Sequence, residues 1–320
     1  MKLSRHIVIG CLMLVLASYT WAADNGEAPP EGPEWEQDSY AHLKKRVGLT
    51  RFQNKSVLLD DRLATAIDET LADQLPKTDE AIVPVQEATP AFAALRERQP
   101  RHLSGAIDNM TLIQVGREAG MNAVVAGTIM EVRHFKQEMG YWWFRDVVCF
   151  VEIQLIGSVY DTETGAKLLD ITLEEKVDLP EELYLQIETG DFAGAFPDIE
   201  NLVVVIATRL AQEIGDKVEA EPFKVFVKEM DRPHVTVSSG ANAGLRPGDL
   251  FAIVDSGRMV TGKEEHRFFV VGGQTGILRI DTVREDTADG TVVQGRMTGR
   301  HDCFKPIVKP SLFERLFFGD

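Results

Sequence analysis

The chain has 320 residues and a formal net charge of −16, with 44% hydrophobic and 26% charged residues. An excess of acids this large disfavours binding to nucleic acid and to anionic lipid, because both of these partners are negatively charged. A chain of this length has room for about two domains.

Residues 1–22 predict a signal peptide. Lys2 and Arg5 supply the positive start, Ile7–Tyr19 is mostly apolar, and Ala22 is a small residue at a suitable cleavage point. The apolar run is short for a membrane span, which needs about 20 residues. We therefore expect an exported, periplasmic protein, with association to the outer membrane left open.

The cysteines add little to this assignment. Cys11 follows Val8-Ile9-Gly10, as in a lipoprotein signal, but the apolar stretch before it is too short for one. Cys149 and Cys303 fall in what we expect to be different domains. Two separate buried thiols are therefore expected, although an oxidising compartment would allow a disulfide between them.

The predicted elements begin after residues 23–44, an acidic leader rich in Pro and Gly that we expect to be flexible. A helix capped by Asp60 or Asp61 should end at Pro76. Its apolar residues recur every four positions, at Leu63, Ile67, Leu71 and Leu75. On either side of this helix we expect strands at 46–52 and 81–85.

Residues 87–110 have some helical pattern but are expected to be mostly irregular. The segment 111–119 predicts a helix, with Thr111 as a weak cap and Gly120 as its stop, because glycine tolerates the positive φ of a helix end. The apolar, β-branched run that follows predicts a buried strand at 122–133.

A polar and aromatic excursion, 134–146, separates this strand from the next one at 147–160. Residues 161–165 predict a hairpin turn with Gly165 in the left-handed conformation. The strongly alternating segment 167–177 predicts the following strand. We expect a loop at 178–197 and then a helix to residue 218, capped by Asp198. Its LVVVIA core would also suit a strand, but the four-residue spacing of Leu202, Ile206, Leu210 and Ile214 favours a helix.

This order of elements predicts an α+β fold, in which a mixed β-sheet with packed helices is followed by a small all-β barrel domain. The barrel is expected because short apolar runs separated by Gly, Asp and Pro follow residue 222. The predicted divisions are a signal peptide (1–22), a flexible acidic leader (23–44), an α/β domain (45–220), a small β-barrel (221–305) and an amphipathic carboxy-terminal tail (306–320).

The α/β segment resembles the module shared by the curli-secretion channel family, the amino-terminal domain of Tol-Pal translocation protein B and periplasmic activators of peptidoglycan synthases. Three stretches carry the resemblance: the strand and turn ending in Phe52-Gln53-Asn54, the helix-to-strand unit 116–128, and the hairpin 159–165. They occur in the family's order and cover about residues 45–218.

The second segment resembles the small carboxy-terminal barrel of flagellar assembly protein T. The resemblance rests on residues 240–251, GANAGLRPGDLF, in which Pro247 and Gly248 suit the central positions of a type II turn. Together the two resemblances imply a non-enzymatic periplasmic accessory or scaffold protein that assists assembly of an envelope machine, most closely of the flagellar-assembly kind. A curli-type outer-membrane secretion or channel subunit, and an activator of peptidoglycan synthesis, are the alternatives.

Two segments are candidate partner-binding sites. Tyr141, Trp142, Trp143 and Phe144 cannot all be buried on one side of a strand, so they could dock a partner or touch a membrane. They could equally be divided between the sheet and the solvent. Near the end of the chain, Leu312, Phe313, Leu316 and Phe317 would form one face of a short helix. This face could bind a groove on another protein or pack onto the barrel.

No catalytic, cofactor or metal motif is evident. No G-x-S-x-G elbow or phosphate-binding glycine loop occurs, and His301-Asp302-Cys303 are adjacent residues that cannot all reach one ion. We expect no enzyme activity, although a hydrolase with an unrecognised site is a weaker alternative. The expected partners are envelope proteins of a flagellar basal body or secretion machinery, with a homo-oligomer open, no nucleic acid and at most peripheral membrane contact.

Overall fold

The computed structural model describes residues 40–58, 61–263 and 265–307. The sheet part contains β1 (Lys45–Leu49), β2 (Gln53–Asn54), β3 (Ile82–Val85), β4 (Ala123–Tyr141), β5 (Phe144–Asp161) and β6 (Lys167–Leu179). Its helices are α1 (Asp61–Thr78), α2 (Pro90–Glu97), α3 (Asn109–Glu118), α4 (Glu181–Glu188) and α5 (Phe196–Glu219). The predicted signal peptide and most of the leader lie outside the described residues.

The sheet is mixed, as the sequence predicts. Its strand order is β3-β1-β4-β5-β6, with β2 paired to β4. The pairs β1–β3 and β1–β4 are parallel, whereas β4–β5 and β5–β6 are antiparallel. Parallel strands need a crossover connection, and α1 supplies one between β1 and β3.

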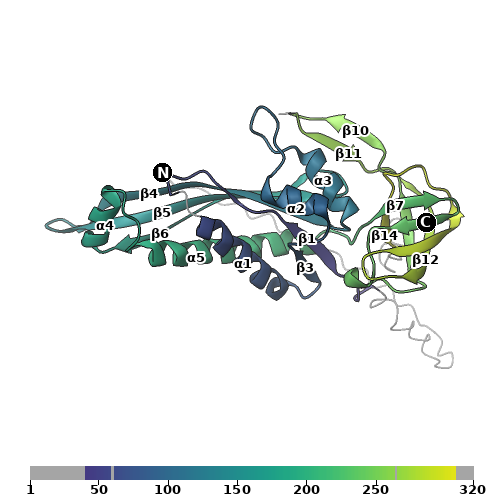
Figure 1. Ribbon diagram of the computed structural model, residues 1–320, viewed down its shortest axis with the longest axis horizontal. Helices are drawn as coiled ribbons and strands as arrows, with labels where there is room; N and C mark the ends of the chain where they lie inside the picture. The colour runs from purple at the N-terminus through teal and green to yellow at the C-terminus, as the bar shows by residue number, and fades with distance from the viewer. Residues whose placement is uncertain (1–39, 59–60, 264, 308–320) are drawn as a thin grey trace, which may run out of the picture. The chain divides into compact units, whose positions relative to one another are not determined.

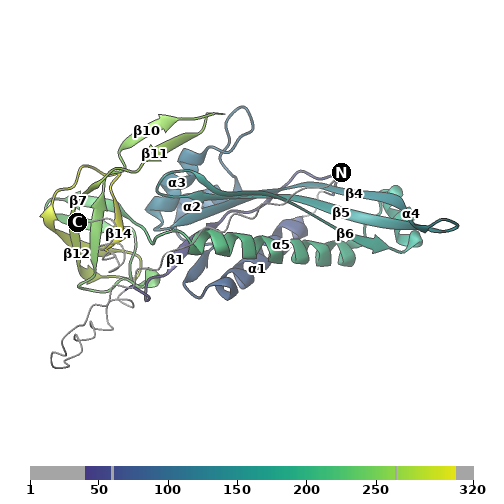
Figure 2. The ribbon, with the colours of Figure 1, turned by 180° about the vertical axis from the view of Figure 1, so that it is seen from behind.

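Helices cover both faces of the sheet (Figures 1 and 2). Helices α1 and α5 pack on one face together with Val125 and Ile153, and α2 and α3 pack on the other face with Val124 and Ala126. The four-residue repeats predicted for α1 and α5 are all buried. The LVVVIA segment is helical, which confirms that its spacing outweighs the strand preference of its valines.

Several predicted boundaries were wrong. Asp108 caps α3 by accepting hydrogen bonds from Met110 and Thr111, so the helix begins before Thr111. Pro76 lies inside the last turn of α1 and does not end it. The expected loop 178–197 contains α4, and the mostly irregular stretch 87–110 contains α2, capped by Thr89. Short helices carry too few periodic positions to stand out in a sequence.

Gly120 follows α3 with a φ of +67°, as predicted for a helix stop. It has a second role that the sequence does not show. A Cβ at this position would lie 1.9 Å from the backbone oxygen of Ser238, which belongs to the barrel. Glycine is therefore required both by the local backbone and by the close approach of a distant segment.

The second part is a closed six-stranded barrel with the order β12-β13-β8-β7-β14-β9, which confirms the predicted α+β fold with a small barrel. Gly248 has a φ of +97°, as the expected turn requires. Its strands are β7 (Val225–Asp231), β8 (His234–Val237), β9 (Leu250–Val254), β12 (Gln274–Val283), β13 (Ala288–Gly295) and β14 (Cys303–Pro306), with a 3₁₀ turn at Ala241–Ala243.

Two segments outside the barrel wall are attached to other parts of the chain. Residues 40–44, assigned to the leader in the sequence, contact the barrel: Leu43 is buried in its core, and the Tyr40 hydroxyl donates to the Leu250 carbonyl. A separate hairpin of β10 (Arg258–Thr261) and β11 (Arg267–Val270) leaves the barrel, and the amide of Phe269 donates to the Thr164 carbonyl in the sheet part.

Candidate interaction surface

The predicted excursion at 134–146 is instead regular antiparallel structure. Strands β4 and β5 pair without a break from His134 opposite Val151 to Tyr141 opposite Phe144. Trp142 and Trp143 are the two residues of the connecting turn. The excursion expected between two strands was wrong, because these residues continue both strands up to the turn.

The end of this ribbon extends beyond the rest of the sheet. The last residue of β6, Leu179, pairs with Cys149, whereas β4 and β5 continue for five more pairs, from Gln137 opposite Val148 to Tyr141 opposite Phe144. At about 3.4 Å per residue these pairs extend about 17 Å past the end of β6. We call residues 137–148 the hairpin tip.

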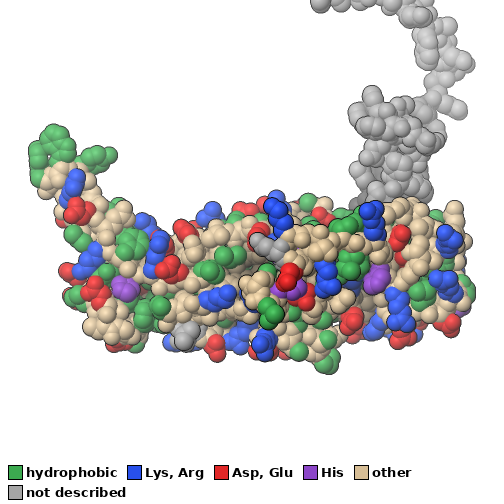
Figure 3. Space-filling view, turned by 90° about the horizontal axis from the view of Figure 1, so that it is seen from above, with side chains coloured by type: hydrophobic (Ala, Val, Ile, Leu, Met, Phe, Trp, Pro, Cys, Tyr) green, Lys and Arg blue, Asp and Glu red, His purple; other side chains and the backbone are tan. Residues whose placement is uncertain are grey.

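Aromatic side chains dominate the turn of the hairpin tip. Tyr141, Trp142 and Trp143 are 89%, 76% and 75% exposed, and the rings of the two tryptophans meet edge to face at 5.1 Å. Figure 3 shows hydrophobic side chains gathered at the end of this projection, at the far left. Of the two alternatives left open by the sequence, the exposure of both tryptophan rings favours the one in which they face outward.

Alternation along β4 extends this apolar surface down one face of the ribbon. Met139, 49% exposed, and Phe135 share a face with Tyr141, and Phe135 stacks on Phe150 of β5 with ring centroids 5.6 Å apart. The opposite face is more polar, with Arg145 and Glu138 paired at 3.2 Å. The hairpin tip therefore carries apolar groups at its end and on this face, where Gln137 and Asp146 also lie.

Trp142 has a backbone conformation that is costly for a bulky side chain. Its φ is +55°, in the left-handed region that glycine or asparagine usually occupies at the first central position of a two-residue hairpin turn. Such strain is of the order of 1–3 kcal/mol and is concentrated at functional positions in proteins. The placement of a tryptophan at this position favours a functional role for its side chain rather than a role in stabilising the fold.

The other predicted surface cannot be placed, because Leu312, Phe313, Leu316 and Phe317 lie outside the described residues. Within the described part, Cys149 and Cys303 are both buried and free, as expected. His301, Asp302 and Cys303 serve local structure: Asp302 accepts hydrogen bonds from the backbone of Thr298 and Gly299, while Cys303 pairs with Phe226 in the barrel wall.

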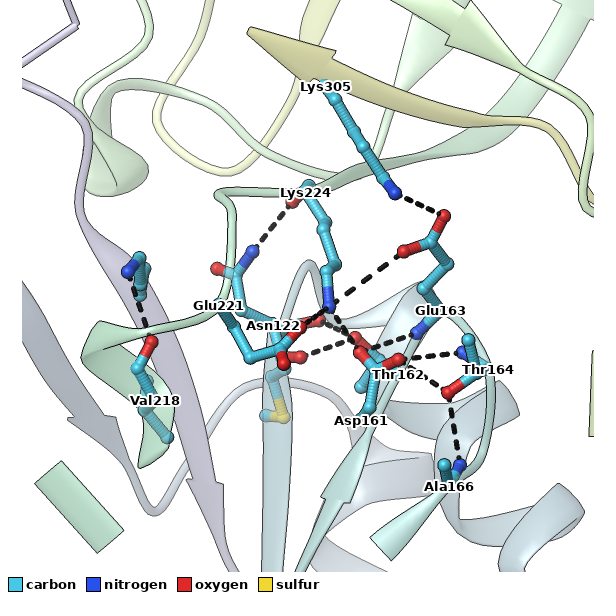
Figure 4. Close-up of polar contacts among 12 residues, drawn as sticks. Asn122, Asp161, Thr162, Glu163, Thr164, Ala166, Val218, Glu221, Lys224 and Lys305 are labelled. Atoms are coloured by element: carbon cyan, nitrogen blue, oxygen red, sulfur yellow. Dashed lines mark hydrogen bonds and ion pairs between the residues drawn. The ribbon is translucent and has the colours of Figure 1, made fainter. Parts of the chain in front are cut away.

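Sequence reasoning missed a buried ionic cluster that joins the sheet to the barrel (Figure 4). Lys224, which leads into β7, is 1% exposed, and its ammonium lies 2.5 Å from Asp161 Oδ1 and 2.8 Å from Glu221 Oε2. Asp161 ends β5. Lys305 of the barrel pairs at 2.8 Å with Glu163 of the predicted turn. We call this group the ionic junction.

Neutral hydrogen bonds and one guanidinium complete the ionic junction. The Asn122 amide donates to the Lys224 carbonyl at 2.9 Å and accepts from the amide of Arg46 at 3.1 Å. Arg117 donates from Nε to the Thr162 carbonyl at 2.6 Å and lies 4.3 Å from the ring centroid of Phe269. The sheet and barrel are thus joined by charge, hydrogen bonds and cation–π contact together.

The charges within the junction stabilise one another despite their burial. Burial alone would raise the pKa of Asp161, but the Lys224 ammonium and hydrogen bonds from Thr164 and Glu163 lower it below its usual value. Burial alone would lower the pKa of Lys224, but Asp161 and Glu221 raise it above its usual value. Both groups are therefore ionised at neutral pH. A lone lysine among apolar residues, FKVFV, was the signal available in the sequence.

Two features of the described residues concern metal sites and membrane-spanning helices. In that part of the chain, no three His, Cys, Asp or Glu side chains are grouped so that they could hold a metal ion. Within 40–58, 61–263 and 265–307, no helix combines the length and apolar character that crossing a membrane requires.

Comparisons with known proteins place the chain near several bacterial structures without assigning a family. No family model matches the sequence, and no curated protein matches it. Among solved structures, the fold is similar to the hypothetical protein CT253 from Chlamydia trachomatis, with 13% identity, a TM-score of 0.36, and coverage of 56% of this chain and 100% of that one. It is also similar to lipoprotein GNA1162 from Neisseria meningitidis, with 12% identity, a TM-score of 0.27, and coverage of 49% and 99%. TolB from Acinetobacter baumannii is similar at 9% identity and a TM-score of 0.24, over 77% of this chain and 57% of TolB.

Proposed function

We propose that this chain is a non-enzymatic accessory or scaffold protein of a bacterial cell envelope, of the flagellar-assembly-T kind, that works in the periplasm. The observation that carries the proposal is the hairpin tip, where Tyr141, Trp142 and Trp143 are exposed on a strained turn. Tyrosine and tryptophan are the residues that most often anchor protein interfaces. The predicted signal peptide and the resemblances of the two domains in the sequence supply the compartment.

The partner expected from this chemistry is an envelope protein with an apolar groove that accepts the end of a β-hairpin. Its groove would receive the two tryptophan rings, and Arg145 and Glu138 would remain at the rim, where paired charges contribute little affinity. The acidic net charge of the chain favours a partner whose surface around the groove is basic.

A subunit of a curli-type channel is the second candidate, because such a function would also use a long hairpin with an apolar face. The five pairs of the hairpin tip extend about 17 Å past the end of β6, whereas the hydrocarbon core of a bilayer is about 30 Å thick. This difference favours docking to a protein over crossing a membrane, and the experiment below separates the two.

The test is capture of partners from gently crosslinked envelopes of the organism that encodes the chain, followed by mass spectrometry. The full chain is compared with a variant carrying Tyr141→Ser, Trp142→Gly and Trp143→Asn, which keeps residues suited to a two-residue hairpin turn. The matched control carries Val204→Ser and Val205→Ser, which remove exposed apolar side chains from α5 (41% and 56% exposed).

We expect envelope-machine proteins with the parent chain and with the α5 control, and loss of these proteins with the tip variant. Recovery of flagellar basal-body proteins would establish the finer assignment. Equal capture by the tip variant would refute docking through the hairpin tip. Recovery of the chain alone, as a species of many copies, would refute the accessory role and favour the channel.

A further inference from the structure

A second candidate site lies at the opposite edge of the sheet, where β1 and β3 end. These two strands are adjacent and parallel. After β1 the chain runs through the short strand β2 to α1 on one face of the sheet, and after β3 it runs to α2 on the other face. Where neighbouring parallel strands are followed by helices on opposite faces, a crevice opens at their carboxyl ends, and ligands of open α/β sheets bind in such crevices.

The crevice is present in this chain as a cavity of about 180 Å³ between α1 and α2. A second hollow of about 360 Å³ adjoins it and shares Gln86, Arg96 and Glu97 with it. The charged and amide residues that line the smaller cavity are Arg51, Asp68, Glu69, Gln86, Arg96 and Glu97. They come from the ends of both strands and from both helices.

An incompletely bonded ion pair lies in the wall of this cavity. Asp68 is only 4% exposed, and its Oδ2 accepts a hydrogen bond from Arg96 Nη2 at 3.0 Å. Among the described residues, its other oxygen, Oδ1, has no hydrogen-bond partner, and neither has Arg96 Nε. In the described part of the chain, the same ion pair thus has one buried acceptor atom and one buried donor atom without a hydrogen-bond partner. Buried polar groups normally find partners, so the two open atoms indicate a missing group.

The charges around the pair select the kind of group. Asp68, Glu69 and Glu97 outnumber Arg51 and Arg96, so the cavity has an excess negative charge. The Arg51 guanidinium lies 3.8 Å from the Glu97 carboxylate, so part of the Arg51 charge is balanced at the rim of the cavity. A ligand with a positive donor for Asp68 and an oxygen acceptor for Arg96 would satisfy both open atoms and the net charge.

We propose that this cavity binds an α-amino group with its neighbouring oxygen, as found in a free basic amino acid or in the first residue of a peptide. The ammonium would donate to Asp68 Oδ1, and the carboxylate or carbonyl oxygen would accept from Arg96 Nε. Both open atoms are covered in the present conformation. Entry of the ligand would require the wall to move, and Arg96 is the less buried member of the pair, with its side chain 22% exposed.

The ionisation of Asp68 provides an independent readout. Burial raises the pKa of this carboxyl to about 6, although the Arg96 and Arg51 guanidiniums act in the opposite direction and Glu97 adds to the rise. An ammonium binds only the ionised carboxylate. Affinity should therefore fall about tenfold between pH 7.5 and pH 5, since about one carboxylate in eleven is ionised one pH unit below its pKa.

The test is isothermal titration calorimetry of the full chain at pH 7.5 with three probes: L-lysine, the dipeptide lysyl-glycine and Nα-acetyl-L-lysine. Binding of lysine or of the dipeptide, with at least tenfold weaker binding of the acetylated probe, is expected. Tighter binding of the dipeptide identifies a peptide end as the source, and tighter binding of lysine identifies a free amino acid. No binding of either at 10 mM, or equal binding of the acetylated probe, overturns the proposal.

Variants test the residue assignment. Asp68→Asn should weaken binding at least tenfold, whereas Asp73→Asn, an exposed position on the same helix that pairs with Lys77, should change it less than twofold. Unchanged binding by Asp68→Asn refutes the assignment. If Asp68→Asn does not fold, the pH profile of the parent chain decides: an affinity that stays constant between pH 7.5 and pH 5 refutes it equally. The hairpin tip takes no part in any of these readouts, so they do not depend on the proposed function.

Discussion

Replacement of Lys224 by methionine tests whether the ionic junction holds the barrel to the sheet. The change keeps most of the apolar length of the side chain but removes the ammonium that lies 2.5 Å from Asp161 and 2.8 Å from Glu221. Asp161 is 3% exposed and cannot exchange the lost partner for water. Its remaining hydrogen bonds come from Thr164 and the amide of Glu163.

The expected loss follows from the charge left without its partner. Breaking a buried ion pair by removing one member costs about 3–5 kcal/mol, because the remaining charge stays buried. Each kcal/mol lowers the unfolding temperature by about 2–4 °C in a protein of roughly this size. The Lys224→Met variant should therefore unfold about 6–20 °C below the parent chain.

Urea denaturation at pH 7, followed by circular dichroism, measures the free energy of unfolding. Lys217→Met is the control, since this lysine is exposed on the last turn of α5 and its loss should stay within about 0.5 kcal/mol. Adding Asp161→Asn to Lys224→Met removes the uncompensated charge and should recover about 1–2 kcal/mol. A loss below about 1 kcal/mol for Lys224→Met, or no recovery in the double variant, would contradict the account of the junction.

Three further predictions concern stability and reactivity. Gly120→Ala should lose about 2 kcal/mol or more in urea denaturation, because its Cβ would lie 1.9 Å from the Ser238 oxygen at a positive φ; a loss under about 0.5 kcal/mol would contradict this. Burial raises the pKa of Asp68 to about 6, so the native carboxyl holds its proton to higher pH than the unfolded one. The contribution of this proton to the free energy of unfolding is full below about pH 4 and is lost as the pH rises through 6. The free energy of unfolding of Asp68→Asn, measured relative to the parent, should therefore rise by about 1–2 kcal/mol from pH 4 to pH 7.5. A difference between the two proteins that is independent of pH would count against this account. Cys149 and Cys303, 4% and 0% exposed, should react with a thiol reagent only after unfolding, and labelling of the native chain would disprove their burial.

The elements that the sequence predicted well are those with long periodic patterns. The helices carrying Leu63–Leu75 and Leu202–Ile214, the alternating strand at 167–177 and the turn at Gly165 all occur where expected. In each of these elements, local preference and burial favour the same structure, and this agreement is what allows the element to be predicted from sequence. Helix α4 was missed because eight residues offer only two buried positions, Tyr184 and Ile187.

The sites were harder to predict because their groups come together only in three dimensions. Asp161 and Lys224 are 63 residues apart, and Asp68 and Arg96 are 28 apart, so no local pattern connects either pair. The apolar neighbours of Lys224 hint at its burial, but nothing local identifies Asp161 as its partner. The hairpin tip is the exception, since a run of four aromatic residues is conspicuous by itself. Even there, the composition of the segment did not reveal the regular pairing of the two strands.

The same strand carries the hairpin tip and the ionic junction. Strand β5 begins at Phe144, next to the exposed turn, and ends at Asp161, which pairs with Lys224 of the barrel segment. Eighteen residues of extended strand separate the two, or about 60 Å at about 3.4 Å per residue. Strand β5 is paired on both sides for most of its length, which restricts its movement between these ends. A partner held at the hairpin tip would thus be kept at a set distance from the barrel, as a scaffold requires, and loosening the junction by Lys224→Met should disturb this spacing while the aromatic turn itself stays unchanged.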